Sequence, residues 1–284
     1  MSGRLPPWFK QRVPDATVMA DMANLIQDGG LHTICESAMC PNAGECFSRK
    51  TATFLILGDV CTRHCTFCAV KKGAPLPVDP GEPERVSQAS RSLGLRYAVI
   101  TSVTRDDLLD GGASQFAGVV EKLHGEGILA EVLVPDFRGS ADSLTTVVRS
   151  MPEVVNHNVE TVPRLYAEVR PAADYARSLD LLSNVKSHNR DIVTKSGLMV
   201  GLGESNDELI AVFKDLRAAG CDLLTIGQYL QPTPNHHPVV RFVTPGEFEE
   251  YAVEAKRIGF EGVASAPLVR SSYHAASMYA SVRS

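Results

Sequence analysis

The residues of this chain with the clearest chemical potential are six cysteines, arranged as two triplets with different spacings. The first triplet is Cys35, Cys40 and Cys46, and the second triplet is Cys61, Cys65 and Cys68. A cubane iron–sulfur cluster has four irons, and cysteine thiolates are its usual ligands. Three cysteines therefore leave one iron open to a ligand from elsewhere. The sequence predicts two metal clusters with different tasks.

Other uses of these cysteines agree less well with the sequence. Disulfide frameworks are typical of short secreted chains, whereas this chain has 284 residues and starts without an apolar signal stretch. Zinc is a stronger alternative, because His64 or His32 could complete a four-ligand site, although structural zinc sites usually use two close cysteine pairs. A packed helix face would not interleave the second triplet with polar residues. Cys221 lies before an apolar run and is predicted to be a packing residue.

The composition is that of a sizeable enzyme. Hydrophobic residues make up 44% of the chain, and no apolar run approaches the length of about 18 residues that spans a membrane. Lys and Arg number 28 against 33 for Asp and Glu, so the basic surface of a nucleic-acid-binding protein is not expected. We expect small molecules or proteins as partners, with no nucleic acid and no membrane. Reduced thiols without an export signal indicate the cytoplasm.

Beyond the cysteines, strand-like and helix-like segments alternate. The predicted strands are 54–57, 97–100, 130–134, 154–159, 192–200 and 223–229, and the predicted helices are 83–94, 114–124, 141–150, 174–187, 206–219 and 245–258. Val-, Ile- and Leu-rich strands joined by helices are typical of a parallel sheet covered by helices. The pattern predicts an α/β fold, a partial (β/α)6 barrel similar to a TIM barrel. The second triplet follows its first strand and should lie at the carboxyl ends of the strands, where barrels carry their chemistry.

The remaining segments are predicted to extend this barrel. We expect residues 1–50 to form an amino-terminal extension with the first triplet, 51–235 the barrel, and 236–284 a carboxyl-terminal helix and tail, with both extensions covering the barrel mouth. Capping boxes at Ser205 and Thr244 support the helix register. His236 and His237 have no cysteine or carboxylate at ligand spacing, so a loop is favoured over a metal site.

These motifs resemble a known group of enzymes. The second triplet, after the first strand of a parallel barrel, is similar to the radical S-adenosylmethionine (SAM) superfamily, in which three cysteines hold a [4Fe–4S] cluster and SAM chelates its fourth iron. The first triplet and the segment from Arg270 to Ala275 narrow the resemblance to the lipoyl synthase family. Further similar segments are 94–97, 104–108, 110–112, 157–162 and 201–204. The resemblance runs from about Pro7 to Tyr279.

The resemblance implies a sulfur-inserting reaction. Lipoyl synthases add two sulfur atoms, at C6 and C8 of an octanoyl chain attached to a lysine of a carrier domain. These methylenes are neither acidic nor electrophilic, so side-chain acids, bases or nucleophiles cannot activate them and a radical is needed. The implied cofactors are SAM and two [4Fe–4S] clusters. The second triplet would hold the cluster that cleaves SAM, and the first triplet would hold an auxiliary cluster that donates sulfide.

The resemblance also implies roles for other residues. Ser272, with Ser271 as the alternative, would be the fourth ligand of the auxiliary cluster. Phe67 would pack near the adenine of SAM, and Asn158 and Glu160 would bind its ribose or methionine part. The turn 201–204 would bring backbone close to the adenine. Some superfamily members bind the methionine amine with Gly-Gly-Glu after the second strand, and here residues 101–104 read Thr-Ser-Val-Thr, so the partner of the amine stays open.

The implied partners are an octanoylated lipoyl carrier domain or glycine-cleavage H protein, a low-potential electron donor (ferredoxin or flavodoxin) and iron–sulfur assembly proteins. Three alternatives remain from the sequence. A tRNA methylthiotransferase would need a basic surface. Biotin synthase lacks the first triplet and the serine motif. A non-enzymatic iron–sulfur carrier would not need a barrel with a cofactor pocket.

Overall fold

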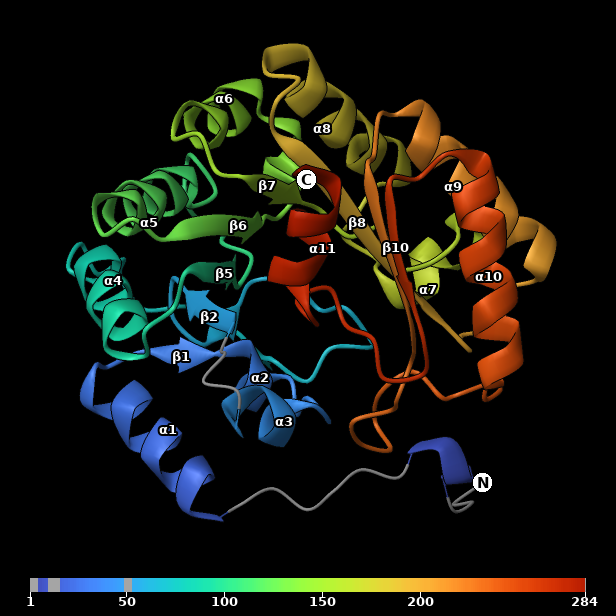
Figure 1. Ribbon diagram of the computed structural model, residues 1–284, viewed down its shortest axis with the longest axis horizontal. Helices are drawn as coiled ribbons and strands as arrows, with labels where there is room; N and C mark the ends of the chain where they lie inside the picture. Colours follow the sequence, from blue (N-terminus) through green and yellow to red (C-terminus); the bar gives the residue numbers. More distant parts are fainter. Residues whose placement is uncertain (1–4, 10–15, 49–52, 284) are drawn as a thin grey trace.

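A single curved sheet forms the centre of the molecule, with helices around its outer face (Figure 1). The computed structural model describes residues 5–9, 16–48 and 53–283. Within these residues, the eight strands of the central sheet lie in the order β1-β2-β5-β6-β7-β8-β9-β10. They are β1 (His32–Thr33), β2 (Thr53–Ile56), β5 (Tyr97–Ser102), β6 (Leu129–Leu133), β7 (Val154–Asn156), β8 (Val193–Val200), β9 (Leu223–Gln228) and β10 (Gly262–Ser265). β1 is antiparallel to β2, and all other neighbours are parallel.

Helices connect the parallel strands and cover them from outside. These helices are α4 (Glu82–Ser92), α5 (Ala113–Gly125), α6 (Ala141–Arg149), α7 (Tyr166–Val169), α8 (Tyr175–His188), α9 (Asn206–Ala218) and α10 (Pro245–Ile258). The capping boxes at Ser205 and Thr244 start α9 and α10, and Gly259 ends α10 at a positive φ of 108°. None of the helices in these described ranges is long and apolar enough to cross a membrane.

The remaining elements lie at the two ends of the chain and beside the barrel. They are the 3-10 turns η1 (Pro7–Phe9), η2 (Phe137–Gly139) and η3 (Pro163–Leu165), the helices α1 (Ala16–Asp28), α2 (Ile34–Ser37), α3 (Ala43–Ser48) and α11 (Ala275–Arg283), and a small sheet of β3 (Val60–Cys61) and β4 (Lys71–Lys72). The expected boundary between residues 50 and 51 lies outside the described residues.

The predicted partial barrel is confirmed, because the six predicted strands form β2 and β5 to β9 in parallel order. The sheet also contains β1 and β10, which the sequence analysis did not predict. The strand predicted to reach Val159 ends at Asn156. The backbone N–H of His157 still donates to Lys195 O of β8 at 3.0 Å, and a bridge joins Glu160 to Leu198 of β8. Glu160 has a φ of 65°, which a regular strand does not accommodate.

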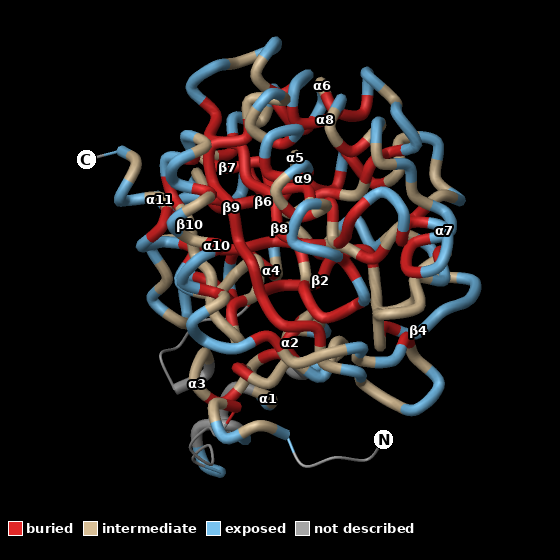
Figure 2. Tube along the Cα trace, turned by 90° about the vertical axis from the view of Figure 1, so that its right-hand side faces the viewer, coloured by how far each residue is buried: buried red, intermediate tan, exposed pale blue. Residues whose placement is uncertain are grey.

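Strands β8 and β9 are buried on both faces, as the red segments of Figure 2 show. Cys221, just before β9, is fully buried and is a packing residue as predicted. A charged pair lies inside the barrel: Lys195 Nζ is 2.9 Å from Glu131 Oε1, and both side chains are 0% exposed. Tyr97 Oη and Asn156 Nδ2 also donate to Glu131, at 2.8 and 3.1 Å. The barrel is therefore filled by a hydrogen-bonded polar layer as well as by hydrophobic side chains.

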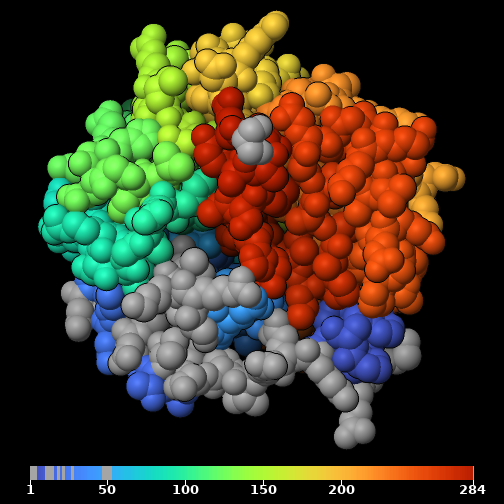
Figure 3. Space-filling model, in the orientation of Figure 1, coloured from blue at the N-terminus to red at the C-terminus, as the bar shows by residue number. Residues whose placement is uncertain are grey.

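Helix α11 closes the amino ends of the strands. Its Met278 packs against Val154, Val193 and Leu223, the first residues of β7, β8 and β9. Figure 3 shows the red carboxyl-terminal segment in the middle of this face of the molecule. In Figure 2, α11 lies at the left, whereas β4 and α7 lie at the right. The loops at the carboxyl ends of the strands are consequently on the opposite side from α11.

Candidate active site

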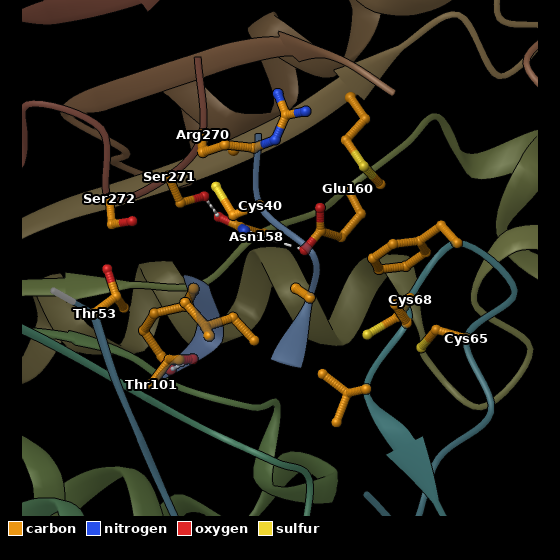
Figure 4. Close-up of a pocket in the computed structure, with 18 of the residues that line it drawn as sticks. Cys40, Thr53, Cys65, Cys68, Thr101, Asn158, Glu160, Arg270, Ser271 and Ser272 are labelled. Carbon is orange, nitrogen blue, oxygen red and sulfur yellow. Dashed lines mark hydrogen bonds between the residues drawn. The ribbon is translucent and has the colours of Figure 1, made fainter. Parts of the chain in front are cut away.

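One cavity at the carboxyl ends of the strands, about 510 Å³ in volume, collects the residues that the sequence analysis singled out. They come from segments far apart in the chain. The residues on its wall are Cys35, Cys40, Cys46, Cys61, Cys65, Phe67, Cys68, Asn158, Glu160, Ser271 and Ser272. Figure 4 shows Cys65 and Cys68 on one side of this cavity and the two serines on the other. The fold thus brings both triplets and the serine motif to a single space.

The loop of the second triplet is fixed by an ion-pair network. Arg63 is buried; its Nε lies 2.7 Å from Asp106, and its Nη2 lies 2.6 Å from Asp136. These carboxylates belong to the loops after β5 and β6. The backbone N–H of Thr66 donates to Val169 O at 3.0 Å, which ties the loop to α7 as well. The cysteines of this loop are therefore presented on a well-supported backbone.

The two histidines of the segment 236–238 support the same loop. His236 Nε2 donates to the carbonyl oxygen of Cys68 at 3.1 Å, and the backbone N–H of His237 donates to Thr66 O at 3.0 Å. Both residues lie in a loop, as predicted.

The first triplet is held by the amino-terminal extension and the carboxyl-terminal loop together. Cys35 lies in α2 and Cys46 in α3, with Cys40 in the turn between them. Asn42 Nδ2 donates to Leu268 O at 2.6 Å. Tyr273 Oη donates to the Glu45 carboxylate at 3.1 Å. The serine motif is thus anchored beside the first triplet by residues that adjoin it in sequence.

The two serines of the motif have different environments. Ser271 Oγ donates to Asn158 Oδ1 at 2.8 Å, a contact drawn as a dashed line in Figure 4. Ser272 also lines the cavity, and its hydroxyl makes no hydrogen bond to any side chain or backbone group in the described part of the chain. This difference favours Ser272 over Ser271 as a metal ligand.

A polar cluster lines the cavity between the serines and the second triplet. Asn158 Nδ2 donates to Glu160 Oε1 at 3.1 Å. Burial raises the pKa of Glu160, and the neighbouring Arg170 opposes that shift. Arg170 Nη1 donates to the carbonyl oxygens of Asn158 and Val159 at 2.9 and 3.0 Å. The place of Arg170 on the cavity wall could not be predicted from sequence, because nothing in its local sequence distinguishes it from a surface arginine.

Two buried polar atoms on residues of the cavity wall are unpaired within the described residues, namely Arg170 Nε and Ser102 Oγ. An unpaired buried polar group costs about 1–3 kcal/mol. SAM carries a carboxylate and an amine that can pair with a guanidinium and a hydroxyl. Ser102 belongs to the Thr-Ser-Val-Thr segment 101–104, which lines the cavity where the partner of the amine was left open. The donor groups of this wall therefore fit SAM.

The turn 201–204 has a structural explanation of its own. The Glu204 carboxylate accepts from the backbone N–H groups of Gly201 and Leu202, at 2.6 and 2.9 Å. Gly201 has a φ of 95°, and a Cβ there would overlap the Gln228 side chain. Among the described residues, those of this turn do not line the cavity. The expected contact of its backbone with adenine is not supported.

Burial keeps several of these thiols in the neutral, unreactive form when no metal is bound. Burial raises the pKa of Cys35 and of Cys68 to about 12, and it also raises the pKa of Cys65. Thiolates are the ligating form, so metal binding at these positions releases protons. Within the described ranges, no three His, Cys, Asp or Glu side chains converge closely enough to hold a single metal ion. A cubane cluster is wider than one ion, and separated thiols suit it.

His157, on the cavity wall, predicts a pH dependence of stability. Burial lowers its pKa from an ordinary value of 6.5 to about 4. Its Nδ1–H donates to Val134 O at 2.8 Å, and Nε2 lies 3.1 Å from the Ser178 hydroxyl, so the folded state holds the neutral ring. Between about pH 6.5 and pH 4 only the unfolded state takes up the proton, and stability therefore falls as the pH falls.

We expect this histidine alone to lower the free energy of unfolding by about 2 kcal/mol between pH 8 and pH 5. The His157→Gln variant should be less stable at pH 8 and should depend less on pH. Anaerobic denaturant unfolding of both proteins at the two pH values measures this. Equal pH slopes for parent and variant would contradict the expectation.

Comparison of the sequence and the fold with known proteins identifies the superfamily of this chain. The sequence profile of the Radical SAM superfamily matches residues 55–216. Among solved structures, the FeFe-hydrogenase maturase HydG from Carboxydothermus hydrogenoformans superposes with a TM-score of 0.61 over 94% of this chain and 68% of its own, at 14% sequence identity. Methylornithine synthase gives 0.55 over 89% of this chain and 83% of its own, at 13% identity. The fold and the profile define a radical SAM protein.

Sequence relatives then specify the family. The lipoyl synthase of Caldanaerobacter subterraneus subsp. tengcongensis is 55% identical over 276 residues, covering 97% of each chain. That of Caldicellulosiruptor bescii is 56% identical over 95% of this chain and 94% of its own. The chain belongs to the lipoyl synthase family. The enzyme class and cofactors expected from the sequence are thereby confirmed: a radical SAM sulfurtransferase that uses SAM and [4Fe–4S] clusters.

Proposed function

We propose that the cavity inserts sulfur at C6 and C8 of an octanoyl chain attached to a lysine of a carrier protein. The observation that carries this proposal is that both cysteine triplets and Ser272 line one cavity. An alkyl chain that enters between the triplets comes within reach of both. Apolar side chains such as Ile34, Leu133 and Met199 are on the same wall and can contact its methylenes.

The second triplet would ligate the cluster that binds SAM, which supplies the organic radical needed to activate an unreactive C–H bond. The residues around it would bind and orient SAM. Arg170 would pair with its carboxylate and Ser102 with its amine, since each has a buried unpaired polar atom. Asn158 and Glu160 would bind the ribose or methionine part, and Phe67 would pack near the adenine. The apolar wall excludes water from the reacting carbon atoms.

The first triplet, with Ser272, would hold the auxiliary cluster that supplies sulfide. Ser272 lines the cavity, and its hydroxyl has no hydrogen bond to the described residues that ligation would displace. A serine oxygen is a harder ligand than a thiolate and is less well matched to an iron–sulfide cluster. This bond would therefore be the weakest that the protein makes to either cluster.

The partners follow from this chemistry. The substrate would be an octanoylated lipoyl carrier domain or glycine-cleavage H protein. A low-potential donor, ferredoxin or flavodoxin, would supply electrons, and iron–sulfur assembly proteins would rebuild the consumed cluster. The reduced thiols suit the cytoplasm.

The Ser272→Ala variant tests the auxiliary site. We expect sulfur insertion to fall by about tenfold or more, as the loss of a metal-site partner does, while SAM cleavage persists. The protein is reconstituted anaerobically with iron and sulfide, and mass spectrometry then follows one or two sulfur additions to an octanoyl-lysine peptide. Ser265→Ala is the control, because Ser265 Oγ donates to Phe248 O at 2.7 Å and lies outside the cavity wall. A Ser272→Ala protein that completes both insertions at the parental rate would remove Ser272 from the site.

A further inference from the structure

The carboxyl-terminal loop passes very close to the inner face of the barrel at two glycines on neighbouring strands. Gly227 on β9 faces Val269, and a Cβ at this position would overlap the Val269 carbonyl oxygen. Gly197 on β8 faces the Ser271–Asn158 hydrogen bond, and a Cβ there would lie 2.8 Å from each of the two bonded oxygens. Only glycine permits such an approach. The loop is therefore seated against the sheet at Ser271.

Ser271 is the first member of a chain of hydrogen bonds that leads away from the first triplet. Its hydroxyl donates to Asn158 Oδ1 at 2.8 Å, and Asn158 Nδ2 donates to Glu160 Oε1 at 3.1 Å. Both contacts are visible in Figure 4. The oxygen of the Asn158 amide thus accepts from Ser271, and its nitrogen donates to Glu160. A flipped amide would direct its oxygen at the Glu160 carboxylate, so the observed orientation is the one that both contacts favour.

Glu160 depends on this support. It follows Val159 at a positive φ of 65°, a backbone conformation that side chains other than glycine rarely adopt. Asn158 Nδ2 is the hydrogen-bond donor to its carboxylate among the described residues. The charges of Arg170 and Arg270 also act on this carboxylate. The direction of the Glu160 side chain is therefore set by Asn158 and, through it, by Ser271.

We propose that Ser271 is a positioning residue for SAM. It holds the Asn158 amide so that Glu160 points toward the part of the cavity where the second triplet would bind SAM. This inference rests on the SAM contacts assigned above to Asn158 and Glu160. It gives the adjacent serines separate tasks, with Ser272 on the auxiliary cluster and Ser271 on the cofactor.

The experiment measures SAM binding to the fully reconstituted protein by equilibrium dialysis without reductant, so that no turnover occurs. Loss of one such hydrogen bond should raise the SAM dissociation constant of Ser271→Ala by about fivefold. Iron content and the KM for the octanoyl-lysine peptide should equal those of the parent. The control is Ser265→Ala, which removes the hydrogen bond from Ser265 Oγ to Phe248 O outside the cavity wall. This variant should bind SAM as the parent does.

A double-mutant cycle shows whether Ser271 acts through Asn158. Added to Asn158→Ala, Ser271→Ala should weaken SAM binding no further, and an additional fivefold loss would overturn the proposal. Asn158→Asp is an independent variant for the case in which Ser271→Ala loses iron. Its carboxylate cannot donate to Glu160, and SAM affinity should fall by more than fivefold; unchanged affinity would overturn the inference.

Glu160→Gln separates this inference from the proposed function. If Glu160→Gln weakens SAM binding and Ser271→Ala leaves it unchanged, the role of Ser271 is wrong and the SAM assignment stands. If Glu160→Gln leaves SAM binding unchanged, the assignment of Glu160 is wrong, and the inference built on it is wrong as well.

Discussion

Alanine replacement of the second triplet is expected to abolish SAM cleavage and sulfur insertion together, whereas alanine replacement of the first triplet should abolish insertion and leave SAM cleavage. The reason is that the two sets of thiols lie on different parts of the cavity wall and would hold different clusters. Each variant should retain about four irons per chain, where the parent holds about eight. Iron assays and chromatographic measurement of 5′-deoxyadenosine after reduction provide the readouts.

Cys221→Ala is the matched control for both variants. Its thiol is fully buried and its Sγ lies 3.2 Å from Leu223 O, away from the cavity wall. Iron content and both activities should therefore equal those of the parent. The assignment of separate clusters to the two triplets is wrong if removal of the first triplet stops SAM cleavage. It is also wrong if removal of either triplet leaves the protein without iron.

Lys195→Met is expected to lower the stability of the fold by about 3–5 kcal/mol, because it removes the cationic partner of the Glu131 carboxylate inside the barrel. Both side chains are 0% exposed, so water cannot replace the lost partner. In a chain of this size, such a loss lowers the thermal midpoint by about 10 °C. Anaerobic thermal unfolding at a fixed scan rate compares the variant with its parent.

The double variant Glu131→Gln with Lys195→Met tests the cause. In the parent, Asn156 Nδ2 donates to Glu131 Oε1 at 3.1 Å and Tyr97 Oη donates to Oε2 at 2.8 Å. A glutamine at position 131 removes the buried charge; its amide oxygen can accept from Asn156 while its NH2 group donates to the Tyr97 hydroxyl. It should recover most of the lost midpoint. A double variant no more stable than Lys195→Met alone would mean that the charge is not the cause.

The alternation of strands and helices could be predicted from sequence because it depends on local patterns. Capping boxes placed the starts of α9 and α10, and runs of apolar residues placed β5 and β9. β10 was missed because Gly262–Ser265 is short and has one large apolar residue. β1, with two residues, carries no periodicity at all. Their places in the sheet are set by pairing with distant strands.

The site could be predicted only where spacing along the chain carried the information. The cysteine triplets and the serine motif are contiguous patterns, and all of them line the cavity. Arg170 and Ser102 are distinguished by buried polar atoms that have no partner among the described residues, a property that depends on the closed barrel and not on the local sequence. Gly197 is likewise unremarkable in sequence, because the atoms that exclude a Cβ there come from Asn158, Ser271 and Thr225.

The anchoring of the serine motif beside the first triplet also orders events during synthesis of the protein. The thiols of both triplets emerge from the ribosome early, but Ser272 is translated after β10, near the carboxyl end of the sequence. If the first triplet and Ser272 hold the auxiliary cluster, as proposed, the three thiols form an incomplete ligand set until the chain has been translated past β10 to Ser272.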